Sequence, residues 1–146
     1  MEKIKVLLVK SYELPIEMEI ENTLEAKQKL VGGNIECVYP RYDDDVLFIC
    51  NDEGKINGMG LNREIGHDVI YGPFLVVGND YVNCDFKSLT DKQLLEYKIR
   101  FDKNSIIRTE NKVLGIIFNI KNKEMERWIY EKTIWWFYSI KNKRYE

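Results

Sequence analysis

The stretch from Thr23 to Pro40 constrains the fold most, because it combines a helix, a glycine stop and a strand. Asn22 or Thr23 can begin the helix, since a side-chain oxygen at that position accepts a hydrogen bond from an unpaired backbone N–H. Gly32 and Gly33 are suited to end it, because the residue after a helix often needs a positive φ. Pro40 cannot donate to a β-ladder and ends the strand that follows. The stretch therefore predicts a helix and a strand joined by a tight connection.

Four further strand signals and a second helix signal flank this stretch. Ile4–Val9 and Val46–Cys50 are continuous apolar runs, which predicts strands buried on both faces. Ile16–Glu21 alternates apolar and charged residues and should pair with the first strand. Val69–Gly78 indicates one more strand, and residues 90–101 indicate a capped helix. This order predicts an α+β fold with a mostly antiparallel sheet and two or three helices in a single compact domain.

The C-terminal part is expected to extend this fold. Residues 112–120 resemble a buried strand and 123–132 a helix, whereas 133–140 fit either a helix or a strand. We accordingly expect an α+β core over residues 1–102 and a basic, aromatic extension over 103–146 that packs on it. The extension contains all three tryptophans of the chain, which form either a second small core or a contact surface. They are Trp128, Trp135 and Trp136.

Composition indicates an ordinary globular protein of the cytoplasm. The chain has 146 residues, of which 45% are hydrophobic and 32% charged, enough to bury a core of its own. The apolar run near the start is closed by Lys10, too early for a signal peptide, and no run approaches the roughly 20 apolar residues of a membrane span. The cysteines Cys37, Cys50 and Cys84 are odd in number and widely spaced, so we expect buried thiols and no disulfides.

Charge is distributed unevenly along the chain, although the net charge is only −2. Residues 1–102 contain 12 basic and 19 acidic side chains, whereas residues 103–146 contain 10 and 5. Such asymmetry is typical of a protein with a charged partner, and it also fits two complementary halves or simply solvated faces.

Catalytic motifs are scarce. His67 is the only histidine, so a histidine-based metal site or a Ser-His-Asp triad would lack partners. The chain contains no C-x-x-C pair and no phosphate-binding G-x-x-x-x-G-K-[ST] loop. Asp43, Asp44 and Asp45 lack the alternate spacing that directs oxygen ligands at one cation. We therefore expect no enzyme and no cofactor, with a site built from two carboxylates as the remaining catalytic alternative.

Two sets of residues have the chemistry of recognition, because arginine and aromatic side chains hold phosphates or stack on planar groups. One lies around residues 39–42 and at the 62–63 corner, where we expect an arginine-to-alanine change to weaken an anionic ligand and leave the fold intact. The other lies in the basic tail, where surface packing or an interface is favoured over direct nucleic-acid binding. The candidate binding residues are Tyr39, Arg41, Tyr42, Asn62, Arg63, Arg127, Trp128 and Trp135.

A series of short motifs also runs in order through residues 3–101. They are Thr23–Ala26, Gln28–Gly33, Ile35–Glu36, Val38–Pro40, Ile49–Lys55, Asn57–Gly58, Leu61–Arg63, Gly72–Phe74 and Ser88–Asp91. In these motifs the chain resembles the family of small proteins called domain of unknown function 3846. Members of that family occur on phages, plasmids and conjugative elements, and some are reported as anti-CRISPR proteins that block type II CRISPR nucleases. The resemblance supplies no catalytic residue.

The resemblance implies a counter-defence protein acting in the cytoplasm of a host bacterium. Together with the scarcity of catalytic motifs, it favours a non-catalytic, stoichiometric inhibitor of a bacterial immune system such as a CRISPR nuclease. One alternative is a sponge that sequesters a nucleotide second messenger, and another is an intracellular enzyme with a cryptic carboxylate site. The expected partner is thus a host defence protein or a nucleotide signal, with no membrane, and the sequence leaves a homo-oligomer open.

Overall fold

A computed structural model describes residues 2–66 and 68–118 of the chain. The chain divides into two units, residues 1–109 and 110–146, and the first unit contains the sheets. The elements are β1 (Lys3–Val9), β2 (Ile16–Glu21), α1 (Leu24–Val31), β3 (Ile35–Val38), β4 (Val46–Asn51), β5 (Leu61–Ile65), β6 (Asp68–Tyr71), β7 (Phe74–Asp80), β8 (Asp85–Lys87), α2 (Asp91–Arg100) and α3 (Lys103–Phe118).

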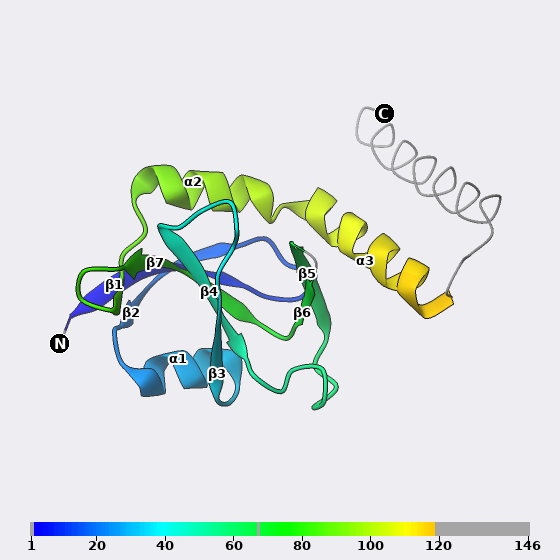
Figure 1. Ribbon diagram of the computed structural model, residues 1–146, viewed down its shortest axis with the longest axis horizontal. Coiled ribbons are helices and arrows are strands. Elements are labelled where there is room, and N and C mark those ends of the chain that lie inside the picture. Colours follow the sequence, from blue (N-terminus) through cyan, green and yellow to red (C-terminus); the bar gives the residue numbers. More distant parts are fainter. Residues whose placement is uncertain (1, 67, 119–146) are drawn as a thin grey trace. The chain divides into compact units, whose positions relative to one another are not determined.

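The main sheet is antiparallel throughout, in the order β2-β1-β7-β4-β3, and β8 pairs with the end of β7 (Figure 1). The alternating strand β2 pairs with β1 as predicted, with Ile4 opposite Ile20. β5 and β6 form a separate antiparallel hairpin. The expected α+β class with a mostly antiparallel sheet is confirmed.

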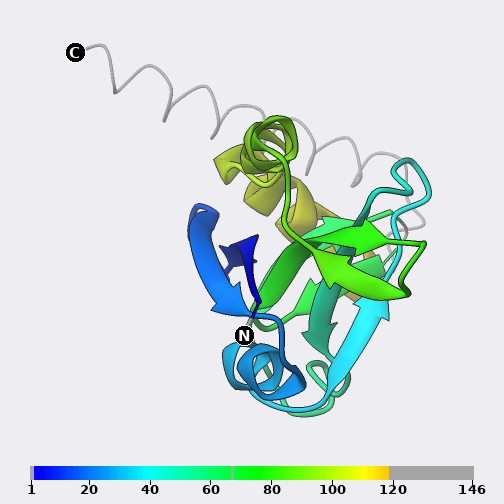
Figure 2. The same ribbon diagram turned by 90° about the vertical axis from the view of Figure 1, so that its left-hand side faces the viewer.

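Both faces of the sheet are buried, which explains the continuous apolar runs of β1, β4 and β7. α1 and α2 lie on opposite sides of these strands (Figure 2). On the α1 side the core contains Ile4, Val6, Leu8, Ile20, Val31, Leu47, Ile49, Leu75 and Val77. On the α2 side it contains Leu7, Val9, Phe48, Phe74, Val76, Leu94, Tyr97 and Phe101, among others.

Aromatic rings dominate the core under α2. The Phe48 ring lies edge-on to those of Phe74, Tyr97 and Phe101, with centroids 5.9, 5.8 and 5.6 Å apart. Such edge-to-face pairs each contribute about 0.5–1.5 kcal/mol beyond the burial of their area. These contacts fix α2 on the sheet and therefore fix the position of the residues at its C-terminal end.

The predicted helix ends are confirmed. Thr23 begins α1, its hydroxyl accepting a hydrogen bond from the Ala26 amide at 3.2 Å. Gly32 ends that helix with φ of 81°, a conformation that glycine adopts without the steric penalty of a Cβ. Thr90 and Gln93 form a reciprocal capping box at the start of α2.

Two expected strands differ from the structure. The single strand over Val69–Gly78 is two strands, β6 and β7, because Gly72 turns the chain with φ of 85° between them. The strand over Lys112–Ile120 is wrong as far as the structure describes it, because residues 112–118 belong to α3. A short apolar run fits either element, and here the helix already begins at Lys103. Residues 119–120, together with the predictions over 123–132 and 133–140, lie outside the described residues.

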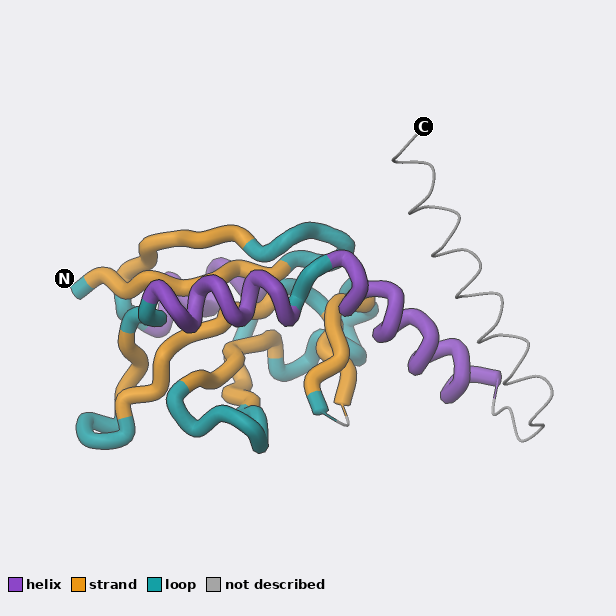
Figure 3. Tube along the Cα trace, turned by 90° about the horizontal axis from the view of Figure 1, so that it is seen from above, coloured by secondary structure: helices purple, strands orange, loops and turns teal. Residues whose placement is uncertain are grey.

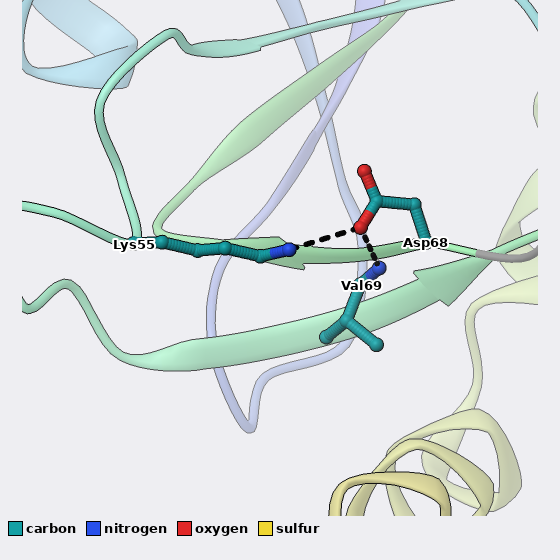
Figure 4. A network of polar contacts seen from close by, with 3 residues as sticks. All are labelled: Lys55, Asp68 and Val69. Atoms are coloured by element: carbon teal, nitrogen blue, oxygen red, sulfur yellow. Dashed lines mark hydrogen bonds and ion pairs between the residues drawn. The ribbon is translucent and has the colours of Figure 1, made fainter. Parts of the chain in front are cut away.

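A surface contact joins the loop between β4 and β5 to the small hairpin formed by β5 and β6. Lys55 Nζ lies 3.0 Å from Asp68 Oδ1, and the same oxygen accepts a hydrogen bond from the Val69 amide at 2.7 Å (Figure 4). Both charged side chains are largely exposed, so the ion pair contributes at most about 1 kcal/mol. The hairpin must therefore be held in place by other contacts.

The three cysteines occupy three different environments. Cys50 is buried in β4, Cys37 is half-buried in β3, and Cys84 is exposed. The expectation that all three thiols are buried is thus wrong for Cys84, which lies in the turn between β7 and β8. Burial raises the pKa of the Cys50 thiol from 9.0 to about 11.

We predict that stability falls as the pH rises from 9 to 11, in part because of Cys50. The unfolded chain releases the Cys50 proton near its ordinary pKa of 9.0, whereas the folded protein retains it up to about 11. The free energy of unfolding should therefore decrease by up to about 2–3 kcal/mol across this window through this group. Denaturant unfolding at several pH values measures the effect.

The matched control is to compare the pH slope of Cys50→Ala with that of Cys84→Ala. The first variant should lose this part of the alkaline slope, and the second should retain it, since Cys84 is exposed. Equal slopes in both variants would show that Cys50 does not contribute.

Candidate binding surface

Arg63 is completely buried, although it is the largest charged side chain of β5. Its guanidinium donates hydrogen bonds to oxygens of four residues. These are Ser105 Oγ at 2.8 Å, Asn62 Oδ1 at 3.0 Å, the Glu13 carbonyl at 2.6 Å and the Phe101 carbonyl at 3.1 Å. Arg63 therefore connects the small hairpin to the loop after β1 and to the junction of α2 and α3. That junction is the short teal loop between the two consecutive purple helices in Figure 3.

Asn62 completes this buried polar network. Its amide donates to the Val9 carbonyl at 2.9 Å and the Gly72 carbonyl at 2.8 Å, while its oxygen accepts from Arg63. Burial lowers the pKa of Arg63 to about 10, and the nearby Asp102 opposes that shift. Arg63 thus stays positively charged at neutral pH and forms no ion pair with a carboxylate of the described residues.

The predicted corner at Asn62 and Arg63 accordingly lies inside the fold. Arg63 offers no donor to a ligand approaching from solvent, because its hydrogen-bonding groups already point at protein oxygens. The expectation that Arg63→Ala would leave the fold intact conflicts with this burial. Asn62 and Arg63 are positioning residues for the surface around them.

Tyr39, Arg41 and Tyr42 are exposed and lie in the loop between β3 and β4. Tyr42 packs against α2, where the Arg100 guanidinium lies 3.9 Å from the centroid of its ring. Next to it, the Tyr97 hydroxyl donates to Asp43 Oδ2 at 2.6 Å. These contacts anchor the middle of the loop on α2 and leave its first part facing solvent.

An acidic hollow of about 360 Å³ opens beside this loop. It forms because β4 and β7 are antiparallel neighbours, with Val46 opposite Gly78, so the loop before β4 meets the turn after β7. We call six of its lining residues the acidic face: Tyr39, Asp43, Asp44, Asp80, Tyr81 and Asp85.

The acidic face combines negative charge with exposed aromatic rings. Tyr39 is 63% exposed and Tyr81 53%. Burial, and to a lesser extent the carboxylates of Asp44 and Asp45, raise the pKa of Tyr81. Hydrogen bonds from Asn83 lower the pKa of Asp80 and keep it ionised. A cationic group with an apolar stem would find both charge and contact area on this face.

A second concave region lies on the other side of Tyr42. Two hollows of about 700 and 250 Å³ share Tyr42, Arg100 and Arg108 in their linings. The larger also contains the carboxylates of Asp43, Glu96 and Asp102. The two regions thus adjoin, and they have different charge chemistry.

The structure unites only part of the predicted set. Tyr39 lines the acidic hollow and Tyr42 the second region, whereas Arg41 is exposed and lines neither. Arg127, Trp128 and Trp135 lie outside the described residues. Sequence reasoning missed Asp80, Tyr81, Asp85, Arg100 and Arg108, although the Asn79–Asn83 turn composition marks part of this set.

Within residues 2–66 and 68–118, no three histidine, cysteine or acidic side chains are grouped so as to hold a metal ion. No helix in the same ranges has the length and apolar character needed to cross a membrane.

The fold and surface define an α+β protein with an antiparallel sheet between two helices and concave polar surfaces at the β3–β4 loop. The chain belongs to the family named domain of unknown function (DUF3846), whose model matches residues 4–102. No curated protein and no solved structure matches the chain. The family match ends just before α3, so it includes the acidic face and Arg100 but not Arg108.

We predict that Arg63→Ala destabilises the protein by roughly 3–5 kcal/mol, because it leaves buried oxygens without donors. Arg63→Lys should also destabilise it, since one ammonium group cannot reproduce a planar fork that reaches four acceptors. Denaturant unfolding of both variants measures the loss.

Arg41→Ala serves as the control, because an exposed arginine change usually stays within about 0.5 kcal/mol. A free energy of unfolding for Arg63→Ala within that margin of the Arg41 variant would contradict the structural role.

Proposed function

We propose that the protein is a non-catalytic counter-defence inhibitor whose acidic face occupies a cationic, nucleic-acid-binding surface of a bacterial immune protein, such as a type II CRISPR nuclease. The observation that supports this most is the acidic face itself. It presents carboxylates from the β3–β4 loop and from the facing ends of β7 and β8, around a hollow flanked by the rings of Tyr39 and Tyr81.

Charge complementarity supports a cationic partner. Surfaces that bind nucleic acid use lysine and arginine to neutralise phosphates, so a cluster of carboxylates can compete for the same side chains. Asp44 and Asp80 enter no ion pair among the residues with described positions. Their charges therefore remain available to a partner.

Aromatic anchors support a protein partner over a free cation. Tyrosine contributes large, rigid contact area and is enriched among the residues that dominate binding energy at interfaces. Val82, 92% exposed in the turn between β7 and β8, adds apolar area beside Tyr81. A partner with arginine side chains would contact both the rings and the carboxylates.

The lowered pKa of Asp80 also fits an inhibitor that acts by binding and not by catalysis. A general acid needs a raised pKa to hold its proton at neutral pH, whereas the pKa of Asp80 is lowered. The face therefore favours binding over acid catalysis at this carboxylate.

The test is inhibition of DNA cleavage by a purified type II CRISPR nuclease with its guide RNA. We predict that D44K/D80K binds the nuclease at least about tenfold more weakly than the wild type, because two attractive charges become repulsive. Association and dissociation rates are measured for binding of each variant to surface-immobilised nuclease. The association rate of the wild type should fall as the salt concentration rises.

The matched control is E25K/E53K, which makes the same change in net charge at exposed positions outside the acidic face. It should bind and inhibit like the wild type. Equal weakening of binding in both variants would show that overall charge, and not the acidic face, determines binding. Inhibition without complex formation at micromolar concentration would overturn the proposal for this target. Recovery of a hydrolysed nucleotide after incubation with the protein would instead favour the alternative of an enzyme with a carboxylate site.

A further inference from the structure

Arg100 and Arg108 belong to two different helices and converge on one concave region. Arg100 is the last residue of α2, and Arg108 lies one turn and more into α3. Together with Tyr42 they line both the 700 Å³ hollow and the 250 Å³ hollow. Both arginines are exposed, and neither makes an ion pair within the described ranges.

The Arg100 fork is held in place before any ligand binds. Its guanidinium lies 3.9 Å from the centroid of the Tyr42 ring. Stacking on an aromatic face reduces the side-chain freedom that a free arginine loses on binding. The charge is therefore pre-oriented without being neutralised.

The smaller hollow has an excess of positive charge. Its lining contains Arg100 and Arg108 against a single carboxylate, that of Glu64. Ser105 also lines it, and the Oγ atom of this serine accepts the hydrogen bond from the buried Arg63 at 2.8 Å. Because Arg63 has only neutral hydrogen-bond acceptors, its charge adds to the positive potential here, opposed in part by the nearby Asp102 carboxylate.

The larger hollow has different chemistry. Asp43, Glu96 and Asp102 line it, which disfavours an anion there and favours groups that donate hydrogen bonds. Ile99 and Tyr97 contribute apolar surface. A molecule with an anionic end and a neutral, donor-rich body would match the two neighbouring hollows together.

We propose that this region binds a nucleoside phosphate, with the phosphate between Arg100 and Arg108 in the smaller hollow and the nucleoside in the larger. The planar arginine fork pairs with phosphate oxygens in a bidentate manner. The sugar hydroxyls and base amino groups supply donors for the carboxylates. The site differs from the acidic face because it contains arginines. A nucleotide bound there would also support the alternative that the protein sequesters a nucleotide second messenger.

Calorimetric titration of the full chain with each of the four ribonucleoside monophosphates tests the proposal, with inorganic phosphate and the free nucleosides as partial probes. At least one monophosphate should bind more tightly than either of its parts. R100Q and R108Q should each weaken that binding by about tenfold or more, the size expected for one charge-assisted contact.

R41Q is the matched control, since Arg41 is an exposed arginine of the same loop as Tyr42 but lines neither hollow. It should bind like the wild type, and D44K/D80K should retain nucleotide binding even where it loses the nuclease. Circular dichroism melting verifies the fold of each variant. No binding at millimolar concentration, or equal weakening by R41Q and R108Q, would overturn the site without bearing on the acidic face.

Discussion

The buried guanidinium of Arg63 adds hydrogen bonds between segments that the apolar core also joins, since Ile65 and Ile70 of the small hairpin belong to the core under α2. The strands and α2 are fixed by ring packing and β-pairing, whereas the β5–β6 hairpin belongs to no part of the main sheet. Arg63 and Asn62 join that hairpin to β1, to the loop after it and to the α2–α3 junction. A buried charge is costly unless its hydrogen bonds are satisfied, so the network specifies one arrangement of these segments.

The same network determines where surface charge can gather. Phe101 and Ser105, which accept hydrogen bonds from Arg63, lie between Arg100 and Arg108 in sequence. Holding the α2–α3 junction therefore brings two exposed guanidiniums to one hollow. On the other side of Tyr42, the antiparallel register of β4 and β7 brings two acidic segments together. Backbone geometry thus places two regions of different charge chemistry around one anchored tyrosine.

Local patterns predicted the elements well and the binding surface poorly. The helix from Leu24 to Val31 was predictable because the residues that begin and end it, Thr23 and Gly32, directly flank it in the sequence. The role of Arg63 was not, because three of its four acceptors lie 38 to 50 residues away. The Asn-Arg pair also resembles an exposed corner in the sequence. Asp80 and Arg100 were missed for the same reason: their relation to residues 39–44 arises only from strand register and helix packing.

The position of Asp43 links the two surface regions physically. One carboxylate oxygen accepts the Tyr97 hydroxyl, and Asp43 lines both the acidic hollow and the larger arginine-bearing hollow. Burial and this hydrogen bond to Asp43 raise the pKa of Tyr97, so the hydroxyl keeps its proton and remains a donor at neutral pH. The two surface regions therefore share one fixed carboxylate, and the contacts of Tyr97 and Tyr42 hold the loop between them on α2.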